Sequence, residues 1–549
     1  MTFARVYLVA AIVLLLSGGM LARLWYLQVY QRDFLQDQGD ARTVRMERIN
    51  AHRGMIQDRF GKPLAVSTPV LSLWANPRLL LESEQDIDPL TDYLGVAPEE
   101  FKTQMQRAGA REFVYLRRHL PPVQAREILG LRIKGVNADR EYQRFYPAGE
   151  VASHVVGVTN IDDKGQEGLE LSFDRWLAGK PGRKKVLKNL YGEIVRDIKP
   201  VAEAVPGKNL TLGIDLRLQY LAYRELKTAV NRYKAESGSI VVLDVETGQV
   251  LAMANQPSYN PNNRKSLDLA AVRNRAVTDV FEPGSTVKPF TVGVALLSGR
   301  YSAASEIDTA PGFVRVGNFT IRDPHDRGVL KLGEIIAHSS QVGITRLALD
   351  LNEYEVWGMF ENLGFGQPAG SGFPGESAGY LPNYRRWKDI DRATFAYGYG
   401  LNVTPLQLAA AYLTIASGGI KRDISLLANT ETNATRIFSE DIARELKDML
   451  ATVVTDGTAR KAAIDGYRVA GKTGTVRKIG EDGYRDTEHL AFFAGLAPVE
   501  QPRLVGVVLI NEPGTQQYGG GDIAAPVFSS VMRNALRIMN VAPEKDGAA

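Results

Sequence analysis

Cysteine is absent from this chain of 549 residues, and histidine occurs only six times. The lack of cysteine excludes disulfides, thiolate catalysis and cysteine-based metal sites, although it does not indicate a cellular compartment. The histidines are scattered and show no H-E-x-x-H or similar ligand spacing, so we predict neither a metal nor another cofactor. The net charge of +4 is small for the size and gives no indication of nucleic-acid binding, and we predict no nucleic-acid partner.

Charged residues are also missing from one stretch near the N-terminus. The seventeen residues from Val6 to Ala22 are uncharged and mostly apolar, and Arg23 follows them. A run of this length is at the short end for a membrane-spanning helix, and the aromatic residues after it suit the membrane interface. A cleaved signal peptide is the alternative, but the run is longer than is usual there and no clear A-x-A site follows. We predict that residues 1–30 form a cytoplasmic tail and a membrane anchor.

The stretch around Ser285 carries a motif that suggests chemistry. Pro283-Gly284 indicates a turn, and the largely apolar residues after it predict a helix that ends near Gly299. Ser285 would then lie at the N-terminal end of this helix, where unpaired N–H groups and the helix dipole favour negative charge. Lys288 lies one turn further along the same face. A hydroxyl beside an amine at such a site is an activated nucleophile with its base. A chain of this length contains about two S-x-x-K matches by chance, so the motif alone decides nothing.

Two further motifs give the serine its context. Lys472-Thr473-Gly474-Thr475 contains the K-T-G triplet that accompanies S-x-x-K in serine enzymes acting on penicillin and on D-Ala-D-Ala peptides. Between the two lies Ser339-Ser340-Gln341, where those enzymes carry S-x-N. Together with the segments 397–401 and 403–408, these motifs make the chain resemble a penicillin-binding transpeptidase.

The resemblance extends to the N-terminal part of the chain. Segments 53–61, 144–147 and 165–170 resemble the N-terminal module of class B penicillin-binding proteins. Residues 339–343 and 373–376, with the run from Tyr397 to Leu408, look most like the division-specific type, penicillin-binding protein 3. Because this N-terminal module is not catalytic in the family, the resemblance implies a pedestal and one active site.

The resemblance also implies roles for the site residues. Ser285 would attack the carbonyl between two D-alanines of a peptidoglycan stem peptide, Lys288 would take its proton, and Ser339 would relay a proton to the leaving amine. Lys472, Thr473 and Thr475 would bind the substrate carboxylate, and Gly474 would let the substrate approach closely. The backbone N–H groups of Ser285 and Thr475 would form the oxyanion hole. A lysine can serve as the base only if burial or a nearby charge lowers its pKa from the usual value of about 10.4.

Gln341 departs from the family pattern, which has asparagine there to bind the peptide backbone of the substrate. Glutamine carries the same amide one methylene further out, so the reaction type is retained while rate or donor preference changes. Two alternatives remain open: a catalytically weak scaffold of the division machinery, which Gln341 suggests, and a relative that hydrolyses or senses β-lactams. Against a hydrolase, the chain contains no E-x-x-L-N stretch of the kind that class A β-lactamases use to activate water. His338 is adjacent to Ser339 and is predicted to be structural.

An ATPase is a rival from a different class. Residues 466–473 match the phosphate-binding pattern G-x-x-x-x-G-K-[ST]. A phosphate-binding loop leads into a helix, however, whereas residues 467–470 resemble a strand and no helix signal follows Thr473. We therefore predict that this segment does not bind nucleotides.

Alternating and apolar segments predict the remaining architecture. Strands are expected at 239–244, 249–253, 490–495 and 504–510, and helices at 441–453, from Thr404-Pro405 to Gly418, and around 528–539. Strands at both ends of this region with helices between them suggest one antiparallel sheet. With the resemblance, this gives an α+β fold: an antiparallel sheet with helices on both sides plus an all-α subdomain, as in serine β-lactamases and transpeptidases. The expected domains are the anchor at 1–30, a mixed, elongated, non-catalytic pedestal of the dimerisation type at 31–205, and a transpeptidase domain at 206–545.

The side of the membrane on which the catalytic domain lies, and the partners, follow from the resemblance alone. It implies a single-pass protein of the cytoplasmic membrane whose catalytic domain lies on the periplasmic side. The expected ligands are peptidoglycan stem peptides, on lipid-linked precursors or nascent glycan, and β-lactam antibiotics. A polytopic glycan polymerase and division proteins are the expected protein partners.

Overall fold

The computed structural model describes residues 2–35, 44–83, 85–188, 194–263, 268–428, 430, 432–480 and 483–544. The chain divides into two compact units. One comprises Met1–Gly54, Ser67–Gln143 and Ala178–Lys208, and the other comprises Met55–Val66, Arg144–Leu177 and Asn209–Ala549. Each unit is described by itself below.

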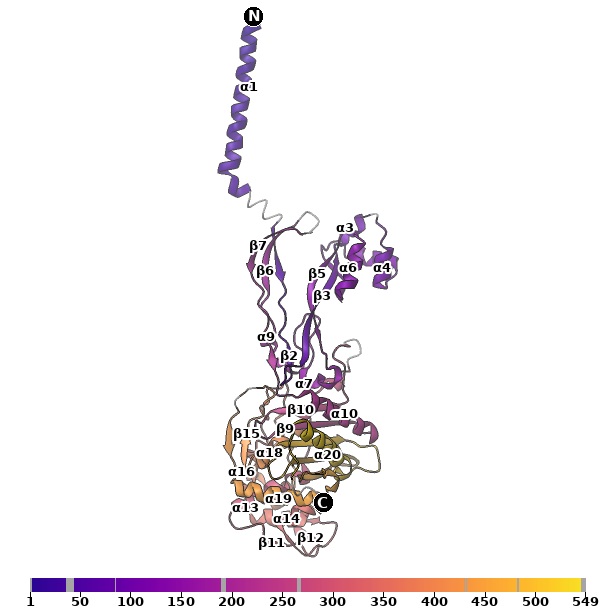
Figure 1. The fold of residues 1–549 in the computed structure, drawn as a ribbon, viewed down its shortest axis with the longest axis vertical. Coiled ribbons are helices and arrows are strands. Elements are labelled where there is room, and N and C mark those ends of the chain that lie inside the picture. Colours follow the sequence, from indigo (N-terminus) through magenta and orange to yellow (C-terminus); the bar gives the residue numbers. More distant parts are fainter. Residues whose placement is uncertain are drawn as a thin grey trace. The chain divides into compact units, whose positions relative to one another are not determined.

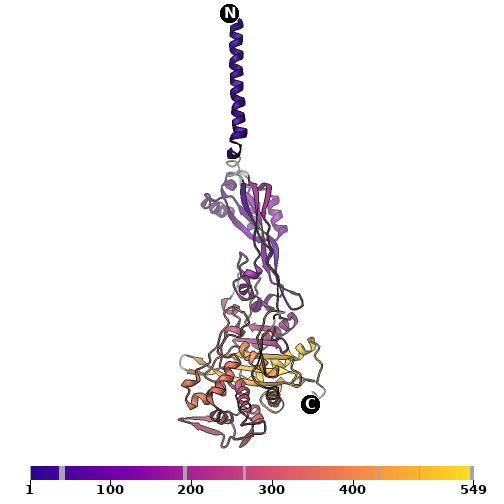
Figure 2. The ribbon, with the colours of Figure 1, turned by 90° about the vertical axis from the view of Figure 1, so that its left-hand side faces the viewer.

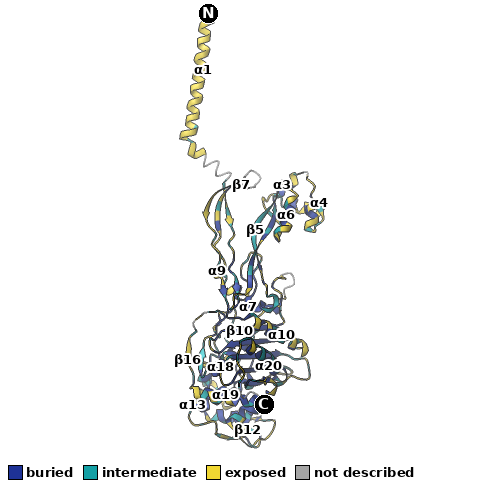
Figure 3. Ribbon diagram, viewed as in Figure 1, coloured by how far each residue is buried: buried dark blue, intermediate teal, exposed yellow. Residues whose placement is uncertain are grey.

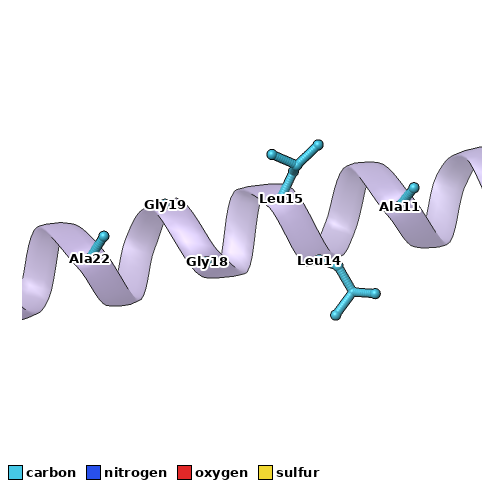
Figure 4. Close-up of a pocket in the computed structure, with 6 residues that line it drawn as sticks. All are labelled: Ala11, Leu14, Leu15, Gly18, Gly19 and Ala22. Carbon is cyan, nitrogen blue, oxygen red and sulfur yellow. The ribbon is translucent and has the colours of Figure 1, made fainter.

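The first unit begins with a long apolar helix, α1 (Thr2–Trp25), followed by a short π-helical stretch, η1 (Tyr26–Tyr30). Nearly all of its side chains are exposed, as Figure 3 shows. Phe3–Tyr30 is long and apolar enough to cross a membrane. Leu14 and Leu15 project from the helix, whereas Gly18 and Gly19 leave its surface bare beside them (Figure 4).

In its described residues, the rest of the first unit contains a three-stranded antiparallel sheet and a small α/β lobe (Figure 1). The three-stranded sheet has the order β1 (Val44–Ile49), β6 (Gly182–Lys188) and β7 (Ile194–Ala202). In the lobe, β4 (Val114–Leu120) and β5 (Val136–Phe145) pair with β3 (Pro63–Ala75); the first four residues of β3 and the last two of β5 belong to the second unit. Each helix of the lobe among the described residues has proline at its first or second position, which suits the helix start because proline lacks the N–H that would be unpaired there. They are α3 (Pro77–Glu82), α4 (Asp88–Leu94), α5 (Pro98–Arg107) and α6 (Pro122–Gly130).

The second unit is built on a five-stranded sheet, counted over the described residues. Every neighbouring pair of its strands is antiparallel. The strand order is β10 (Val250–Gln256), β9 (Ser237–Asp244), β19 (Leu504–Asn511), β18 (Gly483–Ala497) and β17 (Ala470–Gly480). Strands that are far apart in the sequence therefore lie side by side, and β17 is at one edge.

Helices cover both faces of this sheet. Successive side chains of a strand point to opposite faces, so Phe492 and Phe493 of β18 separate the two sides. The Phe493 ring packs on Phe528 of α20 (Gly520–Ile538), with ring centroids 4.7 Å apart. The Phe492 ring packs instead on Phe281, with centroids 4.9 Å apart. The segment that leads to Ser285 thus lies on the face opposite α20, and α10 (Leu216–Arg232) packs on α20.

The chain between β10 and β17 forms a group of packed helices, drawn in pink and orange (Figure 2). Its main helices are α13 (Lys288–Leu297), α14 (Leu332–Ala337), α15 (Gln341–Asp350), α16 (Glu353–Asn362), α17 (Asp389–Phe395), α18 (Pro405–Ala416) and α19 (Glu440–Thr455). Phe290 of α13 is central to this group, since its ring contacts Phe360, Phe365 and Tyr412. Shorter elements connect these helices: α11 (Leu269–Val272), α12 (Arg275–Thr278), β11 (Glu306–Asp308), β12 (Phe313–Val316), β13 (Phe319–Arg322), β14 (Val329–Lys331), η5 (Tyr384–Arg386), β15 (Ile420–Arg422), β16 (Ala434–Arg436) and η6 (Arg460–Ala462).

The remaining elements of the second unit come from its earlier segments. They are β2 (Ile56–Gln57), η2 (Gly149–Val151), α7 (Ser153–Val156), α8 (Gly168–Ser172), α9 (Asp174–Leu177) and β8 (Leu210–Thr211). Arg144 and Glu170, from two segments that the sequence singles out, form an ion pair with 2.6 Å between Nε and Oε1, and both side chains are fully buried. Burying these two charges is tolerated because each group offsets the charge of the other.

The architecture confirms the predicted α+β fold with an antiparallel sheet and an α-helical subdomain. The helix predicted to start at Thr404-Pro405 is also present as α18, in which Pro405 is the first residue and Thr404 caps the helix by accepting a hydrogen bond from Gln407 N. One local prediction was wrong: residues 467–469 are not part of a strand, and β17 begins at Ala470. Tyr467 instead closes a tight turn, since its N–H donates to the Ile464 carbonyl.

Candidate active site

Ser285 lies in a single turn of 3-10 helix, η4 (Gly284–Val287), directly before α13. The segment Tyr397-Gly398-Tyr399-Gly400, which contributes to the family resemblance, holds this turn in place. Gly284 N donates to the Gly398 carbonyl over 3.0 Å, and Phe281 exchanges two backbone hydrogen bonds with Val403. Gly398 has a φ of +91°, and a Cβ atom there would lie 2.2 Å from the Gly284 oxygen. Only glycine therefore allows this close approach to the serine turn.

The structure brings Ser285, Lys288 and Ser339 together. Ser339 Oγ donates to Ser285 Oγ over 2.9 Å. Lys288 Nζ donates to the Ser339 carbonyl over 2.6 Å and to Ser339 Oγ over 3.1 Å. The hydrogen bonds of the described residues thus link the serine to the lysine through Ser339. Ser285 and Ser339 are half-buried, whereas Lys288 is fully buried.

The segment from Ser339 to Gln341 is a tight turn between α14 and α15. Ser339 adopts a left-handed conformation, with φ of +58°, and Ser340 caps α15 by accepting from Gly343 N. Gln341 is the first residue of α15 and is half-buried. Its side-chain amide makes no hydrogen bond to the residues that the structure describes. His338 is the C-cap residue that follows α14, and its ring makes no hydrogen bond to the residues that the structure describes.

The K-T-G triplet lies at the start of the edge strand β17. Lys472 is fully buried, and Thr475 is exposed. The hydroxyl groups of Thr473 and Thr458 lie 2.8 Å apart, and Thr475 Oγ1 accepts from Gly520 N over 2.9 Å. At Gly474 a Cβ would lie 2.0 Å from the Phe492 ring, so packing against β18 requires glycine here. The structure excludes a phosphate-binding loop at residues 466–473, because Gly471-Lys472-Thr473 is extended strand rather than a loop before a helix.

Burial and charge set the protonation of the two lysines. Burial lowers the pKa of Lys288 well below its ordinary value, the positive charge of Lys472 lowers it further, and the negative charge of Asp323 opposes this. Burial lowers the pKa of Lys472 to about 7. The site therefore favours an uncharged amine at Lys288, which is the form that accepts a proton.

Three polar groups of the site escaped the sequence analysis. The Asp323 carboxylate accepts hydrogen bonds from the turn at 340–342, and Thr458 contacts Thr473. Glu282 accepts from Gly400 N and from the Tyr484 hydroxyl, and its burial raises the pKa of this carboxyl. Glu282 is adjacent to Pro283-Gly284 and could have been noticed, whereas the other two reach the site only through the tertiary fold.

Comparison with known proteins indicates the same family as the sequence motifs. Residues 238–533 match the family "Penicillin binding protein transpeptidase domain", and residues 48–212 match "Penicillin-binding Protein dimerisation domain". The chain is 42% identical to the peptidoglycan D,D-transpeptidase FtsI of Escherichia coli K12, over 98% of this chain and 92% of that protein. It is also 42% identical to the probable peptidoglycan D,D-transpeptidase PbpC of Pseudomonas aeruginosa, over 98% of this chain and 96% of that one.

Solved structures of penicillin-binding proteins have a similar fold. The apo transpeptidase domain of Burkholderia pseudomallei penicillin-binding protein 3 shares 39% identity, with a TM-score of 0.57 over 61% of this chain and 97% of that one. Penicillin-binding protein 3 of Mycobacterium tuberculosis in complex with aztreonam shares 26% identity, with a TM-score of 0.71 over 91% of this chain and 99% of that one. The chain therefore belongs to the penicillin-binding transpeptidases. Within that family it is a class B protein of the FtsI type.

Proposed function

We propose that the protein is a peptidoglycan D,D-transpeptidase that cross-links stem peptides through an acyl-enzyme on Ser285. The observation that carries the proposal is the hydrogen-bonded series Ser285–Ser339–Lys288 with a buried lysine at its end. A serine hydroxyl is a weak nucleophile until a neighbouring base takes its proton, and an uncharged lysine is such a base.

In the proposed reaction, Ser285 Oγ attacks the carbonyl of the penultimate D-alanine, and its proton passes to Lys288, directly or through Ser339. The backbone N–H groups of Ser285 and Thr475 stabilise the oxyanion. The C–N bond then breaks, and the proton returns through Ser339 to the leaving D-alanine amine. An amine of a second stem peptide attacks the ester and releases Ser285. A β-lactam follows the same first step, but its leaving nitrogen stays tethered, so the acyl-enzyme persists.

Lys472, Thr473 and Thr475 are the proposed site for the terminal carboxylate of the donor peptide. Thr475 is exposed at the edge strand, and its hydroxyl hydrogen is free to point to a ligand because the oxygen already accepts from Gly520 N. A bound carboxylate would keep Lys472 charged despite its burial. Gln341, whose amide has no described protein partner, is the proposed donor and acceptor for the peptide backbone of the substrate.

We further propose the cellular setting that the family suggests. Residues 1–30 anchor the protein in the cytoplasmic membrane with the catalytic domain outside the cytoplasm. Residues 31–205 form a non-catalytic pedestal, and residues 206–545 form the transpeptidase domain. The enzyme would act in septal wall synthesis beside a polytopic glycan polymerase and other division proteins. A catalytically weak scaffold is the second candidate, and the longer amide of Gln341 is the observation that favours it.

Labelling with a fluorescent penicillin tests the proposal. The wild-type protein should carry a covalent label that persists for hours, and Ser285→Ala should carry none. Rapid loss of the label would indicate a hydrolase instead. A stable label without transfer of a D-alanyl donor peptide to an amine acceptor would favour the scaffold. No label on the wild-type protein would overturn both assignments.

A further inference from the structure

One face of the three-stranded sheet β1–β6–β7 is strongly basic. Residues directly opposite each other in an antiparallel pair point to the same face, and so do residues two apart in one strand. The register of β1 with β6 and of β6 with β7 therefore assigns the paired side chains to one of two faces. Among the described residues, one face holds five cations and no paired carboxylate. These cations, which we call the basic face, are Arg48, Arg183, Lys185, Arg196 and Lys199.

The opposite face of the same sheet is balanced in charge. Its central residue, Lys184, forms ion pairs with Glu47 over 3.2 Å and with Asp197 over 3.1 Å. Val186 of this face is fully buried. The side chains of the basic face are exposed instead, and none of them forms an ion pair with a residue that the structure describes.

Two pairs of like charges lie directly opposite each other on the basic face. Arg48 of β1 is paired with Arg183 of β6, and Lys185 of β6 is paired with Lys199 of β7. Like charges at opposed positions destabilise a sheet, and single solvated cations would not require this arrangement. A bound anion would offset the repulsion, so the arrangement indicates an anionic ligand.

The cations follow the direction of the strands. Arg183 and Lys185 are two residues apart in β6, and Arg196 lies opposite Leu187, a further two residues along the same strand. Two residues of a strand span about 7 Å, so successive positions on the face carry positive charge at that interval. Such a row suits a linear polymer with repeated carboxylates better than it suits a compact anion.

We propose that the basic face binds uncross-linked peptidoglycan strands through the carboxylates of their stem peptides. This inference rests on the proposed function, because that function makes this polymer the substrate of the enzyme. Each uncross-linked stem peptide ends in a free carboxylate, so negative charge repeats along the strand. Binding to the first unit would raise the concentration of stem peptides available to the active site of the same chain, as a second linked binding site does.

The test measures the Kd of fluorescently labelled, soluble, uncross-linked strands by anisotropy. The full-length protein is held in nanodiscs of zwitterionic lipid and treated with benzylpenicillin, so that neither an anionic bilayer nor a free active site contributes. Arg183→Glu with Lys185→Glu reverses two neighbouring charges of the basic face, and Arg183→Gln with Lys185→Gln neutralises them. Arg107→Glu with Arg111→Glu is the matched control, because it changes the net charge equally at exposed arginines of the lobe.

We expect the charge reversal to raise the Kd about tenfold or more at low salt, since each exposed charge pair is worth up to about fivefold in affinity. The neutral variant should show a smaller rise, and the control should keep the wild-type Kd. High salt, or conversion of the strand carboxylates to amides, should weaken binding to the wild-type protein to the level of the reversal variant. If the reversal variant does not fold, the neutral variant decides.

An unchanged Kd in the variants of the basic face, or an equal rise in the control, would overturn the inference and leave the face to another anion such as a lipid surface. Labelling of the wild-type protein with a fluorescent penicillin is measured in parallel. A labelled wild-type protein with an unchanged Kd in the variants means that only this inference has failed. An unlabelled wild-type protein means that the proposed function itself has failed.

Discussion

Replacing Gly398 by alanine should slow the acylation of Ser285, although Gly398 belongs to a different segment of the chain. The added Cβ would lie 2.2 Å from the Gly284 oxygen and 2.5 Å from its nitrogen, in the turn that precedes Ser285. An ordinary contact needs about 1 Å more, and both neighbours are backbone atoms that cannot rotate away. Alanine at φ +91° also costs about 1–2 kcal/mol in backbone energy. We therefore expect an acylation rate constant about 100-fold lower and a free energy of unfolding lower by about 2–4 kcal/mol.

Gly400→Ala is the matched control for this prediction. Gly400 lies two residues further along the same segment and also has a positive φ, +76°, but a Cβ atom there would have no other atom within 4 Å. It should therefore show only the backbone cost and near-normal acylation. The assays are the rate of covalent penicillin labelling and urea unfolding of the same preparations. Equal acylation rates for the two variants would refute the argument that contact with Gly284 positions Ser285.

Three further predictions follow from buried ionisable side chains. Glu170→Ala should lower the free energy of unfolding by about 3–5 kcal/mol in urea denaturation, because Arg144 then loses its buried carboxylate; a loss below about 1 kcal/mol would contradict this. His154 is fully buried against the Ala271 carbonyl and its pKa is lowered to about 4, so the unfolded chain binds a proton near pH 6.5 that the folded chain excludes. Stability should fall by about 3 kcal/mol between pH 6.5 and pH 4, and the same slope in His154→Gln would disprove this origin. Lys472 should take up a proton when a carboxylate-bearing β-lactam binds at pH 8, because its pKa of about 7 rises beside an anion; calorimetry in two buffers that finds no uptake would contradict the carboxylate site.

Local signals made much of the fold predictable. Thr404-Pro405 marks the start of α18 because a hydroxyl cap and a proline at the first position are both local chemistry. The apolar run after Pro283-Gly284 predicted α13 in the same way, and this helix ends two residues before Gly299. The strand expected at 467–470 begins only at Ala470, because Tyr467 pairs with Ile464 in a tight turn, and no local pattern distinguishes such residues from an extended strand.

The site was less predictable where its groups meet through the tertiary fold. Asp323 stands in Arg322-Asp323-Pro324, which looks like an ordinary loop, and its hydrogen bonds to residues 340–342 arise only when β13 lies beside α15. The low pKa of Lys288 has the same origin, since it depends on complete burial and on the charge of Lys472 from a distant strand. The sequence required a lowered pKa for the proposed base, but only the packed structure supplies its cause.

Mass spectrometry of the peptides released after treatment with benzylpenicillin tests the central claim most directly. The account predicts one benzylpenicilloyl group, on the peptide that contains Ser285. It predicts that this group is absent in Lys288→Met, because methionine has a similar length and suits a buried position but cannot accept a proton. An adduct on another residue, or an unmodified Ser285 in the folded wild-type protein, would contradict the account.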